Sequence, residues 1–87
     1  MSRLINIGFG NMVSSDKVIA IITPDSAPAK RQIQMAKENQ TVIDATQGRK
    51  TKSIIFTQGD RLILSALQPD TLAGRFNNIE NTTEDKE

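Results

Sequence analysis

The sequence of 87 residues has no cysteine and no histidine, and phenylalanine is its only aromatic residue type. The lack of cysteine excludes disulfides, thiolate nucleophiles and most structural zinc sites, and it suits a reducing compartment. The lack of histidine removes the usual acid–base group at neutral pH and the commonest ligand of transition metals. We therefore expect no metal, no cofactor and no catalytic residue, and we do not expect an enzyme.

Long apolar runs are missing as well. The longest, residues 18–22, is far too short to cross a bilayer, and residues 1–3 do not lead into the apolar stretch of a signal peptide. We therefore expect a cytoplasmic protein without a membrane partner.

The net charge of +1 hides an uneven distribution. Residues 1–79 carry ten Lys and Arg against six Asp and Glu, whereas residues 80–87 carry four acidic residues and only Lys86. The last eight residues also contain no apolar side chain, which is typical of disorder. The sequence predicts a single mildly basic domain over residues 1–79 and a disordered acidic tail over residues 80–87.

Hydrophobic periodicity predicts the α+β class, with a small, mostly antiparallel sheet of about five or six strands and two short helices. Ser26 caps the first helix, which ends near Glu38, and Pro69 with Asp70 opens the second. Residues 8–11 are expected to form a turn, and residues 47–50 a hairpin connection. The predicted strands cover residues 3–7, 17–22, 41–45, 52–56 and 61–65.

Several predicted strands have apolar residues at both odd and even positions, and so on both faces of the sheet, as in the run from Ile19 to Ile22. A sheet that is apolar on both faces needs both faces covered, and two short helices cover roughly one. We therefore expect neighbouring subunits to cover the second face.

Two glycine-containing segments resemble nucleotide-binding motifs only superficially. The segment from Gly8 to Gly10 lacks the third glycine and the following helix of a dinucleotide fingerprint, and it lacks the basic and aromatic residues of an RNA-recognition motif. The segment 48–52 has Arg49 between glycine and lysine and a strand after it, so it is no phosphate loop. We interpret the first segment as a structural turn, and with only three phenylalanines in the sequence we do not expect a base-stacking platform.

The densest basic segment contains Arg49, Lys50 and Lys52. Long basic side chains on a projecting loop can contact a phosphate backbone, but such clusters are also common on ordinary solvated loops. Lys30 and Arg31 fit an exposed helix face, and Lys17 is uninformative alone. Most aspartates occupy turns or caps, where they have structural roles.

Longer strings carry more information than composition. Residues 5–13 (INIGFGNMV), 24–28 (PDSAP), 44–52 (DATQGRKTK), 63–65 (ILS) and 68–69 (QP) closely resemble the RemA family of small bacterial regulators of extracellular-matrix, or biofilm, genes. The resemblance covers about residues 4–76, without a gap and in the same order.

The resemblance implies a LytTR-like fold and a DNA-binding transcriptional activator, whose subunits form a ring of about seven or eight copies with double-stranded DNA along its outer surface. Such a protein would be nucleoid-associated. In the family, DNA binding depends on an arginine at the position of Lys17 and on two arginines that follow a Thr-His-Gly segment. In this sequence those two arginine positions hold Arg49 and Lys50, and Gln47 replaces the histidine of the segment. Lys30 and Arg31 also match basic family positions. The predicted nucleic-acid-binding residues are Lys17, Lys30, Arg31, Arg49, Lys50 and Lys52.

Two other functions remain open from the sequence. One is a protein associated with RNA or the ribosome, and the other is an oligomeric scaffold without a nucleic-acid partner. A steep loss of affinity with salt favours DNA, because duplex binding by basic side chains releases counterions.

Overall fold

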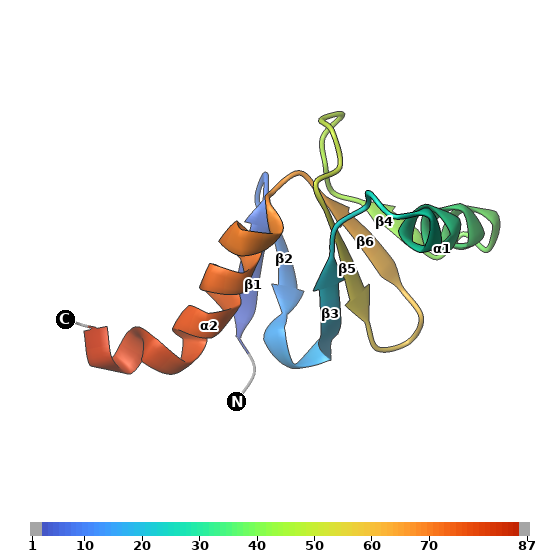
Figure 1. Cartoon of the computed structure of the whole chain (residues 1–87). Coiled ribbons are helices and arrows are strands. Elements are labelled where there is room, and N and C mark those ends of the chain that lie inside the picture. The colour runs from blue at the N-terminus through green and yellow to red at the C-terminus, as the bar shows by residue number, and fades with distance from the viewer. Residues whose placement is uncertain (1–2, 86–87) are drawn as a thin grey trace.

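The computed structural model describes the backbone of residues 3–85 and the side chains of residues 3–77. Two β-sheets lie between two helices, with one helix at each side of the strands (Figure 1). In chain order the elements are β1 (Leu4–Gly8), β2 (Asn11–Ser14), a short 3-10 helix η1 (Ser15–Lys17), β3 (Val18–Ile22), α1 (Ala27–Glu38), β4 (Val42–Asp44), β5 (Ser53–Thr57), β6 (Leu62–Ser65) and α2 (Pro69–Asp85). The predicted α+β class is confirmed.

The strands of the described chain form two sheets, whereas the sequence predicted one. β1 and β2 make an antiparallel hairpin, and the other four strands have the order β3-β5-β6-β4. In that second sheet β3–β5 and β5–β6 are antiparallel and β4–β6 is parallel, so the pairing is mostly antiparallel, as predicted. The sequence missed β2, because Met12 and Val13 are its only apolar residues and no alternation marks a strand.

The prediction that residues 47–50 form a hairpin connection is wrong. β4 and β5 lie on opposite sides of β6, so residues 45–52 cross over the end of β6. A short polar connection with glycine commonly joins adjacent antiparallel strands, which is why the sequence indicated a hairpin. β4 instead pairs in parallel with β6, with Val42 opposite Leu62 and Asp44 opposite Leu64. We call residues 45–52 the β4–β5 loop.

Alternate residues of β5 and β6 face opposite sides of the four-stranded sheet. Ile54 and Leu64 pack on the side of α1, whereas Ile55 and Ile63 pack with the β1–β2 hairpin and Leu72 of α2. Burying each such side chain contributes about 1.5–3 kcal/mol. The expectation that neighbouring subunits must cover the second face is therefore wrong for the centre of the sheet, because the hairpin and α2 of the same chain cover it.

Buried hydroxyl groups connect the two sheets to the segment that leads into α2. The Ser65 hydroxyl donates to the carbonyl oxygen of Ile7 at 2.8 Å and accepts from the amide of Leu67 at 3.1 Å. The Ser53 hydroxyl donates to the carbonyl oxygen of Leu67 at 2.6 Å. Both serines are fully buried, so these hydrogen bonds fix β1, β5 and β6 relative to one another away from water.

The helices begin where the sequence predicts. The Ser26 hydroxyl accepts from the amide of Ala29 at 3.1 Å, and a proline lies in the first turn of α1. α2 begins at Pro69 and continues through residues 80–85, part of the segment expected to be disordered. The side chains from residue 78 onward and residues 86–87 lie outside the described part, so the domain boundary at residue 79 stays a prediction.

Candidate functional site

The β4–β5 loop stands on the end of β6. At its start the amide of Ala45 donates to the carbonyl oxygen of Leu64 at 2.9 Å, and at its end the amide of Lys52 donates to the carbonyl oxygen of Ser65 at 2.9 Å. The loop projects beyond the upper end of the strands in Figure 1. Backbone hydrogen bonds thus hold both ends of the loop, and its middle extends into solvent.

The side chain of Asp44 shapes the start of the loop. Its Oδ1 accepts from the Thr46 hydroxyl at 2.6 Å and from the Thr46 amide at 2.9 Å, and Thr46 is buried. The hydroxyl hydrogen bond, followed by the amide hydrogen bond, holds the pKa of Asp44 below its ordinary value, and the positive charge of Lys37 acts in the same direction. This role of Asp44 was not predicted from the sequence, although an aspartate two residues before a threonine at a loop start is a recognisable Asx turn.

After Thr46 the backbone enters the left-handed region at Gln47 and Gly48, with φ of 56° and 80°. The amide of Arg49 then donates to the carbonyl oxygen of Thr46 at 3.0 Å and closes the turn. Arg49 and Lys50 follow directly, and both side chains are exposed. The turn therefore presents two cations at the tip of a fixed loop.

The turn between β1 and β2 lies at the same end of the strands. Phe9 is its tip, with a φ of 55°, and both flanking glycines also have positive φ. The side chain of Asn6 accepts from the Gly8 amide at 2.7 Å, and the side chain of Asn11 donates to the Gly8 carbonyl oxygen at 2.9 Å. A β-carbon at Gly8 would lie 3.4 Å from Leu67, about van der Waals contact, so the φ of 117° rather than lack of space favours glycine there. The predicted turn is confirmed, and it holds an aromatic ring that is 49% exposed.

These two turns, forty residues apart in the sequence, meet in space. The guanidinium carbon of Arg49 lies 5.9 Å from the centroid of the Phe9 ring, within the range of a cation–π interaction. Beside this pair is a hollow of about 360 Å³, here called the basic hollow. The described residues that line it are Phe9, Arg49, Lys50, Lys52, Ala66 and Leu67, with no acidic side chain among them.

The structure brings together three of the six predicted basic residues and separates the others. Lys17, in η1, lies at the opposite end of the strands, where its carbonyl oxygen accepts from the Gln58 amide at 2.9 Å. Lys30 and Arg31 are exposed on α1, outside the lining of the basic hollow. The sequence indicates only a structural turn at Phe9, since nothing in it shows that the ring contacts Arg49.

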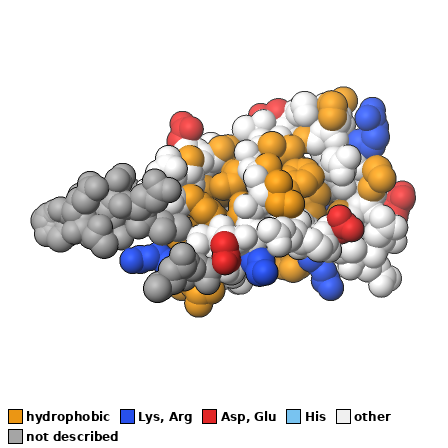
Figure 2. Space-filling view, turned by 90° about the horizontal axis from the view of Figure 1, so that it is seen from below, with side chains coloured by type: hydrophobic (Ala, Val, Ile, Leu, Met, Phe, Trp, Pro, Cys, Tyr) orange, Lys and Arg blue, Asp and Glu red, His pale blue; other side chains and the backbone are white. Residues whose placement is uncertain are grey.

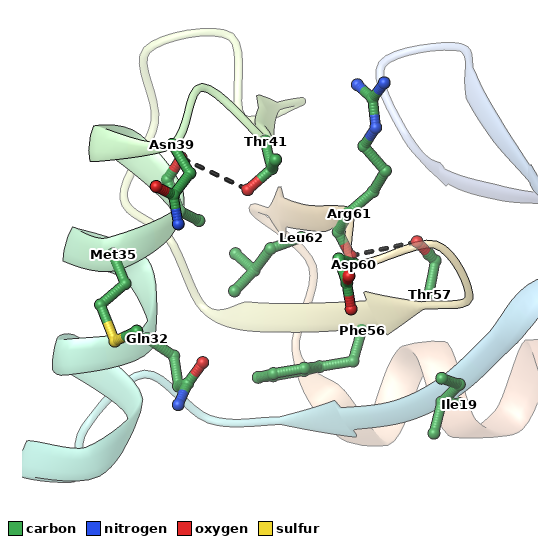
Figure 3. A pocket seen from close by; sticks show the side chains of 11 residues that line it. Ile19, Gln32, Met35, Asn39, Thr41, Phe56, Thr57, Asp60, Arg61 and Leu62 are labelled. Atoms are coloured by element: carbon green, nitrogen blue, oxygen red, sulfur yellow. Dashed lines mark hydrogen bonds between the residues drawn. The ribbon is translucent and has the colours of Figure 1, made fainter.

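A larger hollow of about 530 Å³ lies between α1, β3, β5 and the β5–β6 turn (Figure 3). We call it the α1 hollow. Met35, Phe56 and Leu62 surround it, and Arg61 points away from these apolar side chains. Among the residues that the structure describes, no three His, Cys, Asp or Glu side chains are grouped to hold a metal ion. The lining of the α1 hollow is mixed, because polar side chains such as those of Gln32, Asn39 and Asp60 lie beside the apolar ones.

Comparison with known proteins identifies the family of the chain. The family model described as "Extracellular matrix regulatory protein A-like" (RemA-like) matches residues 4–76. The chain belongs to the RemA-like family. The match spans both turns of the basic hollow, so the hollow is part of the RemA-like domain.

Three similar RemA-like relatives are each named as a regulatory protein. One from Alkaliphilus oremlandii is 54% identical over 82 residues, 94% of this chain and 88% of the relative. One from Fervidobacterium nodosum is 56% identical over 84 residues, 97% and 88% of the two chains. One from Caldicellulosiruptor saccharolyticus is 59% identical over 73 residues, which cover 84% of this chain and 72% of the relative. These names support a regulatory role, and no helix in the described part of this RemA-like chain is long and apolar enough to span a membrane.

Proposed function

We propose that this RemA-like protein is a DNA-binding transcriptional regulator that contacts double-stranded DNA through basic side chains repeated around a homo-oligomeric ring. The observation that carries the proposal is the basic hollow, in which Arg49, Lys50 and Lys52 gather on a fixed, projecting loop without a lining acidic residue. The family description supports extracellular-matrix genes as the regulated targets.

The chemistry of these side chains favours contact with phosphates over recognition of base edges. Lysine presents a point charge, whereas arginine can form two parallel hydrogen bonds with a guanine or a phosphate. Of the three cations in the hollow, only Arg49 has that geometry. DNA recognition then depends mainly on the shape and flexibility of the duplex, with modest sequence specificity.

One subunit provides few phosphate contacts, and nonspecific binding of that kind is typically about micromolar or weaker at physiological salt. Repetition of the loop around a closed ring makes later contacts intramolecular and raises the affinity. A ring also explains how Lys17 can contribute to DNA binding although it lies far from the basic hollow of its own chain. Head-to-tail neighbours can place the lower end of one subunit beside the upper end of the next.

Head-to-tail closure requires two different surfaces that fit each other, because its contacts are heterologous. Two separate groups of exposed apolar side chains are present. Leu4 and Met12 lie on the outer face of the hairpin, 71% and 52% exposed, and Ile19 and Met35 border the α1 hollow, 67% and 46% exposed. Figure 2 shows hydrophobic side chains gathered in the middle of the lower face. These groups support a ring in which one apolar surface packs on the other.

The test is duplex binding over a salt series, together with the native mass of the protein. We expect a mass well above the 9.6 kDa of one chain and a logarithm of affinity that falls by about 0.9 per phosphate contact for each logarithmic unit of salt. The double variant Arg49→Ala with Lys50→Ala is expected to bind duplex at least about 100-fold more weakly with an unchanged native mass.

The matched control is Arg3→Ala with Lys37→Ala, which removes the same charge from exposed residues outside the basic hollow. It should retain most of the affinity. A monomer at micromolar concentration would overturn the ring, and equal loss in both double variants would overturn the role of the hollow. If transcription of matrix genes in a deletion strain is restored by the double variant, DNA contact by this loop is not the function.

A further inference from the structure

We propose that the basic hollow also binds a single nucleotide unit, with an unpaired base stacked on Phe9 and its phosphate held by Lys50 and Lys52. The inference goes beyond the proposed duplex binding: it uses the same cations, but it adds an aromatic surface that a duplex phosphate backbone does not need. It rests on the meeting of the two turns, which no string in the sequence shows.

The backbone of the turn that carries the aromatic ring is constrained. Phe9 is held in a left-handed conformation that non-glycine residues adopt only at some cost. The hydrogen bonds of Asn6 and Asn11 to Gly8 fix the backbone directly before the ring. A half-exposed ring on a constrained turn suits stacking, because little backbone freedom is lost when a base binds.

The other side of the hollow suits a phosphate. Arg49, Lys50 and Lys52 provide positive charge without a lining acidic residue, and Ala66 and Leu67 provide an apolar floor. A volume of about 360 Å³ is within the range of small-ligand sites, about 300–1,000 Å³, near its lower limit. An aromatic surface, an apolar floor and three cations match a ligand that is planar at one end and anionic at the other.

Binding of duplex DNA alone does not explain why an exposed aromatic ring, that of Phe9, lies beside the three cations. Bases in a duplex are stacked on their neighbours and present only their edges in the grooves. A base that can lie flat on Phe9 is either part of a free nucleotide or part of an unpaired strand, and the chemistry that the hollow recognises is the same in both.

The first experiment compares ADP with inorganic pyrophosphate, which carries the phosphates without the base, by equilibrium binding to the full-length protein. We expect ADP to bind about tenfold more tightly than pyrophosphate, as expected for one stacked base. Phe9→Leu keeps an apolar side chain but removes the aromatic face, so it should abolish this preference and leave pyrophosphate binding unchanged. Lys50→Ala with Lys52→Ala should weaken both ligands.

Ile43→Val is the control for Phe9→Leu, because it changes an exposed apolar residue outside both the basic hollow and the α1 hollow. It should bind both ligands as the wild type does. Thermal unfolding of each variant checks that the fold is retained. Equal affinity of the wild type for ADP and pyrophosphate overturns the proposal, and so does an ADP preference that survives Phe9→Leu.

The second experiment separates the two sources of the nucleotide. An oligonucleotide of deoxyadenosine is compared with a duplex of the same length, each in competition with ADP. If the hollow takes a nucleotide of an unpaired strand, Phe9→Leu weakens single-strand binding and leaves duplex binding unchanged. If it takes free nucleotides, ADP binding alone depends on Phe9, and ADP displaces the duplex because both use the same cations.

The outcomes also separate this inference from the proposed function. ADP binding that depends on Phe9 in a protein that does not bind duplex contradicts the proposed function and supports the inference. Duplex binding that depends on Arg49 and Lys50, without a preference for ADP over pyrophosphate, supports the proposed function and contradicts the inference.

Discussion

The two ends of the strands are built differently. The upper end in Figure 1 carries the β1–β2 turn and the β4–β5 loop, and side-chain hydrogen bonds from Asn6, Asp44, Ser53 and Ser65 fix their geometry. At the lower end, the β5–β6 turn is joined to η1 by a backbone hydrogen bond, from the Gln58 amide to the Lys17 carbonyl oxygen. The buried polar side chains of the described part, those of Thr46, Ser53 and Ser65, all lie at the upper end, where two separate turns must be held beside each other.

The charges differ as well. The basic hollow has three lining cations and no lining acid among the described residues, whereas the lower end places Asp16 beside Lys17 and Asp60 beside Arg61. Figure 2 shows both signs of charge on the lower face. Opposite charges in neighbouring positions weaken the field on a distant anion, while like charges add to it. Of the two described ends of the strands, the upper one is therefore better suited to hold a phosphate.

The largest expected effect is on stability, and it tests whether the upper end depends on its buried hydroxyls. Ser65→Ala leaves the Ile7 carbonyl oxygen and the Leu67 amide without their partner, which is expected to cost about 2–4 kcal/mol of the free energy of unfolding. Ser14→Ala at the lower end removes only an exposed hydrogen bond to Asp16 and should change the stability by less than about 0.5 kcal/mol. Urea unfolding of both variants measures the difference, and equal losses would contradict the comparison.

A smaller effect is expected on duplex binding, when one cation is removed from each end of the strands. Lys50→Ala removes a charge from a group of three and is expected to weaken binding about tenfold at low salt. Lys17→Ala removes a charge that has Asp16 next to it in sequence, so a loss of about threefold is expected. Binding of a labelled duplex at a single salt concentration measures both. A larger loss for Lys17→Ala would show that the lower end is the main contact with DNA.

The sequence was sufficient to predict the elements that have strong local signals. Ser26 and Pro28 mark the start of α1, and Pro69 marks the start of α2, because capping and proline chemistry act within a few residues. It was not sufficient to predict that β4 pairs with β6. Strand order depends on packing between distant residues, and a parallel crossover leaves the same polar, glycine-containing connection as a hairpin.

The candidate site was predictable to the same degree. Arg49, Lys50 and Lys52 are close in sequence, so their cluster could be found without a structure. The contribution of Phe9 could not, because it depends on the contact between two turns that only the fold brings together. Lys17 was grouped with the cluster from family resemblance, and the fold places it at the far end of the same subunit.

The smallest expected effect concerns pH and compares the two aspartates whose pKa is lowered. Hydrogen bonds from Thr46 lower the pKa of Asp44, and the hydroxyl of Ser14 lowers that of Asp16, each below the ordinary 3.8. A carboxyl group with a lowered pKa stabilises the folded state above its ordinary value, and this contribution is lost as the pH falls through the lowered pKa. Asp44→Asn should therefore reduce stability at pH 7, and the difference from the wild type should disappear below the lowered pKa of Asp44.

Because Asp44 shapes the β4–β5 loop, Asp44→Asn should also weaken duplex binding at pH 7, whereas Asp16→Asn should not. Thermal unfolding from neutral to acidic pH, together with duplex binding at pH 7, measures both effects, and unchanged binding by Asp44→Asn would show that the loop keeps its shape without this carboxylate.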